Sequence, residues 1–182
     1  MKPNTMGKAV LSVFLTLFFA LSLALPAFAS DSTDWKPGWQ TDAKETLTLV
    51  NEIRVNPKTA QYLELNWTVT EPKLDPLRWD NDLAHIAAVR AEELSRNYGH
   101  MRPNGQWQWS CTYNGKEMYQ ELICREKETA KEAVDYWYAA KSETYNGQEN
   151  RRMLLEDRVT RMGAGHYISE RGEDYWVIAF GR

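Results

Sequence analysis

None of the side chains that could act as nucleophiles lies in a known catalytic motif. The candidate hydroxyls are those of Ser110 and Ser142, and the only thiols are those of Cys111 and Cys124. A catalytic serine or cysteine needs a general base within hydrogen-bond reach, and a third group must orient that base. The sequence contains no G-x-S-x-G turn, no C-x-x-C pair and no glycine-rich phosphate loop. It therefore predicts no catalytic residue.

Residues 1–29 have the features of an export signal. Two lysines are the only charged residues in this segment, and the stretch from Ala9 to Leu25 is apolar apart from Ser and Thr. The small residues Ala27 and Ala29 are typical of the cleavage site that follows such a stretch. A retained membrane anchor is the alternative, because these 17 residues approach the roughly 20 that span a bilayer. We expect cleavage after Ala29, which leaves a secreted, extracellular or cell-envelope protein without a stable membrane span.

Both cysteines lie in the exported part of the chain, where disulfides form and persist. We therefore predict a disulfide between Cys111 and Cys124. It would close a loop of 14 residues, counting both ends, and would contribute on the order of 3 kcal/mol. The alternative is a cysteine nucleophile, but no histidine lies between the two cysteines or close to them in the sequence.

Length and charge limit the class of protein. The 182 residues are 26% charged and 12% aromatic, which excludes wholesale disorder and low-complexity repeats. The formal net charge is −3; without residues 1–29, the count of Lys and Arg falls from 22 to 20 against 25 acids, a net charge of −5. Proteins that bind nucleic acids usually carry a basic surplus, so we expect no nucleic-acid partner. Residues 30–42 are predicted as an irregular lead-in and residues 43–182 as one domain.

Three amphipathic helices and a C-terminal hairpin are expected in this domain. Apolar residues at intervals of three and four predict helices over about 42–54, 81–97 and 129–145. Alternating apolar residues predict strands over 162–168 and 175–180, joined as a hairpin. The segment between the first two helices is predicted as a connection.

Individual residues of these elements carry further expectations. Asp80 is the expected cap of the second helix, and Arg90 and Glu93 are expected on its solvated side. His166 is expected to be a strand residue without chemistry. Three aromatic residues between the second and third helices have two interpretations: they stack on a carbohydrate or lipid, or they pack in the core and at its rim. They are Trp107, Trp109 and Tyr113.

Six short segments, in one order, resemble the CAP superfamily in its bacterial type. This family is also called SCP, for sperm-coating protein, and includes cysteine-rich secretory, antigen 5 and pathogenesis-related-1 proteins. The resemblance covers nearly all of residues 43–182 and implies an α+β fold, a three-layer α-β-α sandwich with a small, mainly antiparallel sheet. The segments that carry it are LVNEIR at 49–54, LDPLRWDNDL at 74–83 with the helix that follows, HMRPNG at 100–105, ELI at 121–123, AVDYWY at 133–138, and the strands at 163–181.

The resemblance also implies a candidate site. Members of this family commonly carry two histidines and two glutamates around an open cleft, a set that can hold a divalent ion such as zinc. His100 matches the first histidine, and Glu121 matches the glutamate of the family's G-E-N segment. The position of the second glutamate is Ala140 and that of the second histidine is Asn150. Half of the set is therefore present.

The incomplete set predicts at most a weak metal site. Zinc sites usually have at least three protein ligands, and an imidazole nitrogen is a better ligand than an amide oxygen. Glu143 lies one turn beyond Ala140 and could add a carboxylate, which would favour weak binding of calcium or magnesium. The expected cleft residues are thus His100, Glu121, Asn150 and Glu143, the first two being the metal ligands if any ion binds, and no cofactor is required.

Two functions follow from the resemblance. The first is a secreted, non-enzymatic binding or recognition module whose reduced cleft takes a lipid, peptide, glycan or protein ligand. The alternative is an extracellular hydrolase or protease that depends on a divalent metal. Metal-assisted hydrolysis needs a firmly held ion with an open coordination position, and the two missing ligands count against it. A resemblance in fold does not name the ligand.

Overall fold

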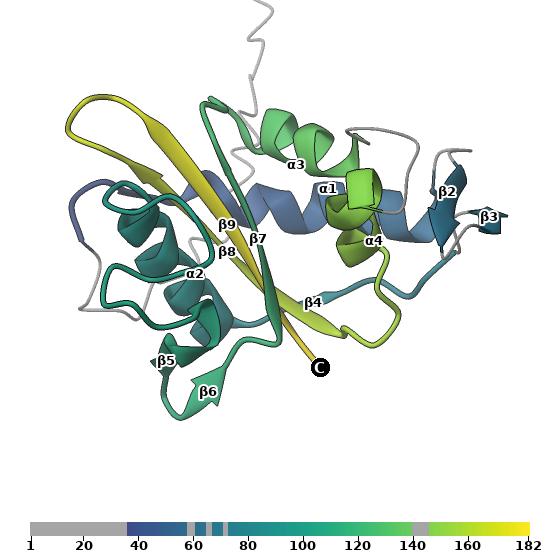
Figure 1. The fold of residues 1–182 in the computed structure, drawn as a ribbon, viewed down its shortest axis with the longest axis horizontal. Helices are drawn as coiled ribbons and strands as arrows, with labels where there is room; N and C mark the ends of the chain where they lie inside the picture. Colours follow the sequence, from purple (N-terminus) through teal and green to yellow (C-terminus); the bar gives the residue numbers. More distant parts are fainter. Residues whose placement is uncertain (1–35, 58–60, 65–66, 71–72, 140–145) are drawn as a thin grey trace, which may run out of the picture. The chain divides into compact units, whose positions relative to one another are not determined.

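Figure 1 shows the protein as a computed structural model, which describes residues 36–57, 61–64, 67–70, 73–139 and 146–182. The predicted leader, Ala140 and Glu143 lie outside these ranges. Within them, no helix is long and apolar enough to cross a membrane. The elements follow in the order β1 (Trp39–Gln40), η1 (Asp42–Lys44), α1 (Glu45–Val55), β2 (Gln61–Glu64), β3 (Trp67–Thr70), β4 (Arg78–Trp79), α2 (Asn81–Leu94), η2 (Gln108–Ser110), β5 (Thr112–Tyr113), β6 (Lys116–Glu117), β7 (Gln120–Arg125), α3 (Ala130–Tyr138), η3 (Asn146–Gln148), α4 (Glu149–Leu154), β8 (Arg161–Ile168) and β9 (Asp174–Gly181).

The largest sheet has five strands. The neighbours β1, β8, β9 and β7 are antiparallel, and β4 pairs in parallel with the start of β8. The predicted C-terminal hairpin is confirmed, because β8 and β9 pair from Arg161 opposite Gly181 to Ile168 opposite Asp174. The expected α+β class with a mainly antiparallel sheet is therefore confirmed.

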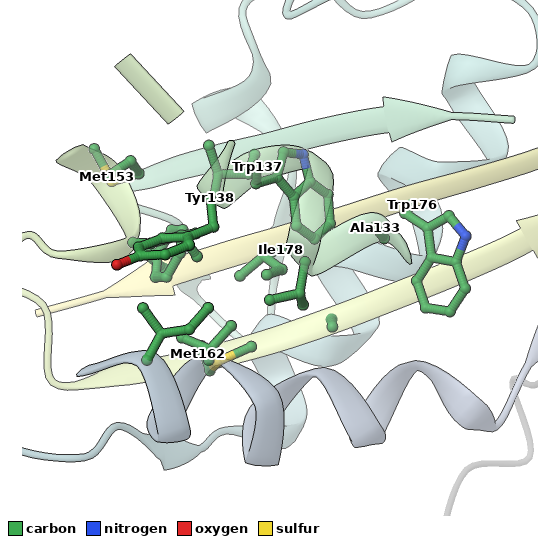
Figure 2. Close-up of a cluster of buried hydrophobic side chains, with 14 of the residues drawn as sticks. Ala133, Trp137, Tyr138, Met153, Met162, Trp176 and Ile178 are labelled. Atoms are coloured by element: carbon green, nitrogen blue, oxygen red, sulfur yellow. The ribbon is translucent and has the colours of Figure 1, made fainter. Parts of the chain in front are cut away.

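Helices pack against both faces of this sheet, because the side chains of each strand alternate between two cores. On β9, the even-numbered residues from Trp176 to Phe180 pack with α1, α3 and α4 in the first core, which Figure 2 shows around Trp137 and Ile178. The odd-numbered residues from Tyr175 to Ala179 pack with α2 in the second core. Figure 1 shows the same division, with α2 on one side of β8 and β9 and the other three helices on the opposite side.

The helices agree with their sequence patterns except at the ends. Asp80 caps α2 as predicted, because its side chain accepts hydrogen bonds from two backbone N–H groups of the first turn at 3.1 Å. α2 ends at Leu94, three residues before the predicted end. α1 begins at Glu45, after the η1 turn. α3 ends at Tyr138, and residues 140–145 of the predicted third helix lie outside the described part of the chain.

Seven strands, β1 to β7, lie where the sequence predicted none, and four of them fall in the predicted lead-in and connection. β1 falls in the lead-in that was expected to be irregular, and Trp39 of this strand is only 5% exposed. β2 and β3 form an antiparallel hairpin, and with β4 they fall in the predicted connection. Each of these four strands has two to four residues, which is too short for an alternating pattern to identify.

The predicted Cys111–Cys124 disulfide does not form, and both thiols are free. Cys124 lies on β7 and packs in the first core, whereas Cys111 packs with α2 in the second. The sheet therefore separates two side chains that are close in sequence. Burial raises the pKa of Cys111 to about 11 and also raises the pKa of Cys124. Both groups are thus thiols at neutral pH.

We expect the native protein to carry two thiols that react only after unfolding. The thiolate is the reactive form of cysteine, and burial suppresses it at both positions. Iodoacetamide at about pH 8 should therefore leave native protein unlabelled and should label both cysteines in urea, as measured by intact mass without reductant. A mass lower by two hydrogens, or a melting temperature that dithiothreitol lowers, would contradict the separation of the two cysteines.

β8 lies so close to α2 that two of its positions accommodate only glycine. A Cβ atom at Gly163 would lie 2.0 Å from the backbone nitrogen of Ala84, and one at Gly165 would lie 2.3 Å from that of Ala88. Backbone atoms cannot rotate aside as the end of a side chain can, so the strand and the helix would have to separate.

We predict that Gly163→Ala and Gly165→Ala each lower the free energy of unfolding by about 3 kcal/mol, measured by urea denaturation. Gly181→Ala is the matched control, because its Cβ would meet only the end of the Leu83 side chain, at 2.9 Å. This control should lose about 1 kcal/mol or less, since the leucine can change rotamer. Equal losses at all three positions would show that the close approach of helix and strand is not the cause.

Candidate functional site

A buried guanidinium joins α2 to β7. The side chain of Arg90 is fully buried, and its Nε and Nη2 donate to the two carboxylate oxygens of Glu121 at 3.0 and 2.9 Å. Its Nη1 donates to Glu93 at 2.8 Å, and Nη2 also donates to the backbone carbonyl of Gly99 at 2.8 Å. Bidentate bonds between arginine and a carboxylate are strong and fix the relative orientation of the two groups. Glu121 is therefore held rigidly against α2.

A second arginine extends these interactions. The Nε and Nη2 of Arg102 donate to the carboxylate of Glu93 at 3.0 and 2.7 Å, and its Nη1 donates to the hydroxyl of Ser110 at 3.2 Å. Burial acts to raise the pKa of Glu93, but the hydrogen bonds from Arg102 and Arg90 outweigh burial, so the pKa lies below its ordinary value of 4.5. Glu93 is therefore an anion held between two cations.

His100 is the exposed member of the site. Its Nδ1 lies 3.0 Å from Oε1 of Glu121. Half of the His100 side-chain surface is exposed, whereas the Glu121 side chain is fully buried. A carboxylate oxygen only accepts, so Nδ1 is the donor in this hydrogen bond. Nε2 has no hydrogen-bond partner among the described residues and is left to contact a ligand.

We name these five side chains the Arg90 network: Arg90, Glu93, His100, Arg102 and Glu121. The positive charges of its two arginines balance the negative charges of its two glutamates. This set of side chains does not fit a zinc ion. Both oxygens of Glu121 already accept from a guanidinium. Across the described ranges, no three or more His, Cys, Asp or Glu side chains are grouped so as to hold a metal ion, whereas zinc usually takes three or four protein ligands. A cation would have to displace Arg90.

Asn150, another of the predicted cleft residues, does not join this network. Asn150 lies on α4, which packs in the first core, whereas Glu121 is bound by α2 on the opposite face of the sheet. In the described part of the chain, no hydrogen bond links Asn150 to His100 or Glu121. Glu143 lies outside the described residues. Of the predicted set, the structure thus brings together His100 and Glu121, and their role in ligand binding stays a prediction.

Sequence reasoning missed Arg90 and Glu93, which were expected on the solvated side of α2. Their exposed fractions are 0% and 7%. A signal was available, because Arg90 follows Leu83 and Ile86 at the helical spacing and so falls on the buried stripe. A basic residue on a buried stripe, with an acid three residues later, predicts an internal ion pair rather than a solvated face.

His166 also has more contacts than the sequence predicted. It is 2% exposed and stacks on Trp176 with ring centroids 3.8 Å apart. Its two ring nitrogens lie 2.8 Å from carboxylate oxygens of Asp42 and Asp174. His166 thus ties the η1 turn to the C-terminal hairpin, on the side of the sheet that faces the first core.

Three solved structures resemble this chain in fold. An outer surface protein from Borrelia burgdorferi is 19% identical with a TM-score of 0.57, over 78% of this chain and 92% of that one. An extracellular protein from Bacillus anthracis that contains an SCP domain is 15% identical with a TM-score of 0.51, over 76% of this chain and 40% of that one. NaASP2, in a structure with Zn2+, is 16% identical with a TM-score of 0.54, over 81% of this chain and 83% of that one. At these identities the likeness concerns the fold alone.

The sequence matches one family over most of its length. Residues 47–180 match the family described as CAP, the cysteine-rich secretory protein family. Comparison with curated protein sequences gives no match. The matched range includes the whole Arg90 network and nearly all of the C-terminal hairpin. The chain therefore belongs to the CAP family, as the order of its motifs predicted.

Proposed function

We propose that this protein is an exported CAP domain that binds a ligand without chemically changing it. One observation carries the proposal: both oxygens of Glu121, the acid of the predicted cleft, are engaged by Arg90 at 3.0 and 2.9 Å. The guanidinium neutralises the carboxylate and occupies its oxygens. Glu121 is then poorly placed to hold a metal ion or to take a proton from water, which are the two roles that a hydrolase would require of it.

The hydroxyl nearest to the network does not support hydrolysis either. Ser110 donates through its Oγ to the backbone carbonyl of Trp107 at 2.8 Å and accepts from Arg102 at 3.2 Å. A serine nucleophile must instead donate to a base that removes its proton. Ser142, the other candidate, lies outside the described residues. The metal-dependent hydrolase therefore has less support than the binding module.

The exposed part of the site suits recognition. His100 presents a ring nitrogen that either donates or accepts according to its protonation state, and the buried Glu121 fixes the orientation of the ring. A contact group that is already oriented loses little conformational entropy when a ligand binds. Binding thus needs no rearrangement of the Arg90 network.

Export is supported by two independent features. The first 29 residues have the pattern of a cleaved signal. The similar folds include a protein described as an outer surface protein and one described as extracellular. Export of this CAP domain from the cell accounts for both the signal-like segment and the extracellular location of these similar proteins.

Metal retention and hydrolysis test this proposal. We expect the purified protein, equilibrated with about 0.1 mM Zn2+ and then dialysed, to keep fewer than about 0.1 ions per chain, and to hydrolyse labelled casein no faster than buffer. His100→Ala should change neither result, and Lys131→Ala, an exposed position on α3, controls for surface changes. Stoichiometric zinc that raises the melting temperature, or hydrolysis that His100→Ala abolishes, would overturn the proposal.

The network itself predicts a dependence of stability on pH. The folded-state pKa of Glu93 is lowered, so its contribution is present above about pH 4.5 and is lost as the pH falls through the lower folded value. Glu93→Gln should therefore be less stable than wild type by about 3 kcal/mol at pH 7 and should lose less stability on acidification. Urea denaturation at several pH values measures both effects. The exposed Glu117→Gln is the matched control, and parallel pH profiles for wild type and Glu93→Gln would contradict the assignment.

A further inference from the structure

The segment that begins within the HMRPNG motif, at residue 103, is unlike the rest of the chain. Residues 103–115 contain no Asp, Glu, Lys or Arg, although the chain is 26% charged and a stretch of this length would hold about three such residues at that average. The uncharged polar residues of the segment are mostly amides and hydroxyls, and three of its members are aromatic. Most of the segment is exposed. A surface that is both aromatic and uncharged selects against ionic ligands.

Two tryptophans of this segment form an exposed apolar patch with Met101. Trp107 and Trp109 are each 50% exposed, and Met101 is 45% exposed. The two indole rings stack with centroids 5.4 Å apart and planes 16° from parallel. Met101 and Trp107 are directly opposite each other in an antiparallel bridge, so their side chains lie on the same side of the backbone. We name Met101, Trp107 and Trp109 the aromatic patch.

The backbone beneath the aromatic patch is held in place. The carbonyl of Trp107 accepts from the backbone N–H and the hydroxyl of Ser110 at 3.0 and 2.8 Å. The N–H of Arg102 donates to the carbonyl of Gln106 at 2.7 Å, and the side chain of Arg102 is anchored on Glu93. The rings are therefore presented on a rigid turn, so a ligand does not have to order them.

Amide groups border the aromatic patch. Asn104 and Gln106 are exposed, and Nδ2 of Asn104 donates to Oε1 of Gln106 at 3.2 Å, while Oδ1 of Asn104 accepts from the backbone N–H of Gln106 at 3.0 Å. Each amide oxygen keeps a second lone pair, and the remaining amide hydrogens stay available as donors. Between the two tryptophans, Gln108 is 92% buried, since its exposed fraction is 8%, and its Oε1 has no hydrogen-bond partner in the described part of the chain. A buried acceptor without a donor is costly, so this oxygen is an unexplained feature of the turn that carries the two indole rings.

We propose that the aromatic patch and its bordering amides bind a neutral oligosaccharide. This inference rests on the proposed function, since it names the ligand class of a binding module. A pyranose ring has one face of C–H groups, which the negatively polarised face of an indole attracts, and a rim of hydroxyls, which both donate and accept hydrogen bonds. The aromatic patch offers the first kind of contact, and Asn104 and Gln106 offer the second.

Other ligand classes fit these residues less well. A phosphate or sulfate would need an unpaired cation, but the guanidinium nearest to the aromatic patch in sequence, Arg102, is already paired with Glu93. A lipid chain makes no use of the amide donors and acceptors around the rings, and would leave them unpaired as it excluded water. The neutral, hydroxyl-rich ligand is the one whose chemistry matches both parts of the surface.

Titration with defined oligosaccharides tests this site. The probes are cellotetraose and tetra-N-acetylchitotetraose, added to the purified protein and followed by amide NMR shifts. We expect one of them to bind with a dissociation constant of about 1 mM or tighter and to shift amides between residues 100 and 115. Trp107→Ala and Trp109→Ala should each weaken binding by about fivefold or more. Tyr136→Ala removes an exposed aromatic side chain on α3 and should leave the affinity within about twofold.

Three outcomes would overturn the inference. No saturable shift with either saccharide, from wild type that is folded by NMR, would do so. Binding of phosphatidylcholine vesicles or a proline-rich decapeptide through Trp107 and Trp109, without saccharide binding, would assign the aromatic patch to another ligand class. If His100→Ala weakens saccharide binding and the tryptophan variants do not, the ligand lies elsewhere and the proposed function survives. Release of shorter saccharides during the titration would instead overturn the proposed function.

Discussion

A guanidinium buried between two carboxylates holds three separate segments of this protein in register. Arg90 lies on α2, Glu121 on β7, and the carbonyl of Gly99 on the loop that leads to His100. Removing one partner of such a pair leaves an unpaired charge inside the fold, which costs about 3–5 kcal/mol. The pairing is therefore best understood as a constraint on geometry: it determines where β7 meets α2 and which way Glu121 points.

This constraint also limits the chemistry of the site. The family resemblance implied a set of ligands for a divalent ion, but in this chain a positive group already occupies the carboxylate oxygens. Because Arg102 balances Glu93 in the same way, the network has no unpaired carboxylate to attract a cation. The fold of the family is thus compatible with a site whose internal charges are satisfied by the protein itself. Such a site presents at the surface an imidazole that is oriented by a buried carboxylate.

The sequence predicted the elements whose patterns extend over many residues. The C-terminal hairpin and α2 with its Asp80 cap follow from periodicity and capping chemistry. The sequence did not predict contacts that depend on which face of the sheet a side chain occupies. Cys111 and Cys124 are thirteen positions apart, yet they pack in different cores, because Cys111 lies at the end of η2 on the α2 side of the sheet, whereas Cys124 points from β7 to the opposite side. The burial of Arg90 and Glu93 was missed because charge was taken as evidence of exposure.

The network and the aromatic patch are physically continuous. Glu93 anchors Arg102, Arg102 donates to Ser110, and Ser110 holds the carbonyl of Trp107. Each link is a hydrogen bond of 2.7 to 3.2 Å, so the position of the indole rings depends on charges buried beneath α2. In the proposed binding module this charged network has a structural role, because it fixes a turn that the ligand would otherwise have to order at a cost in affinity. On that proposal, the buried charges act on binding through the geometry of an uncharged surface.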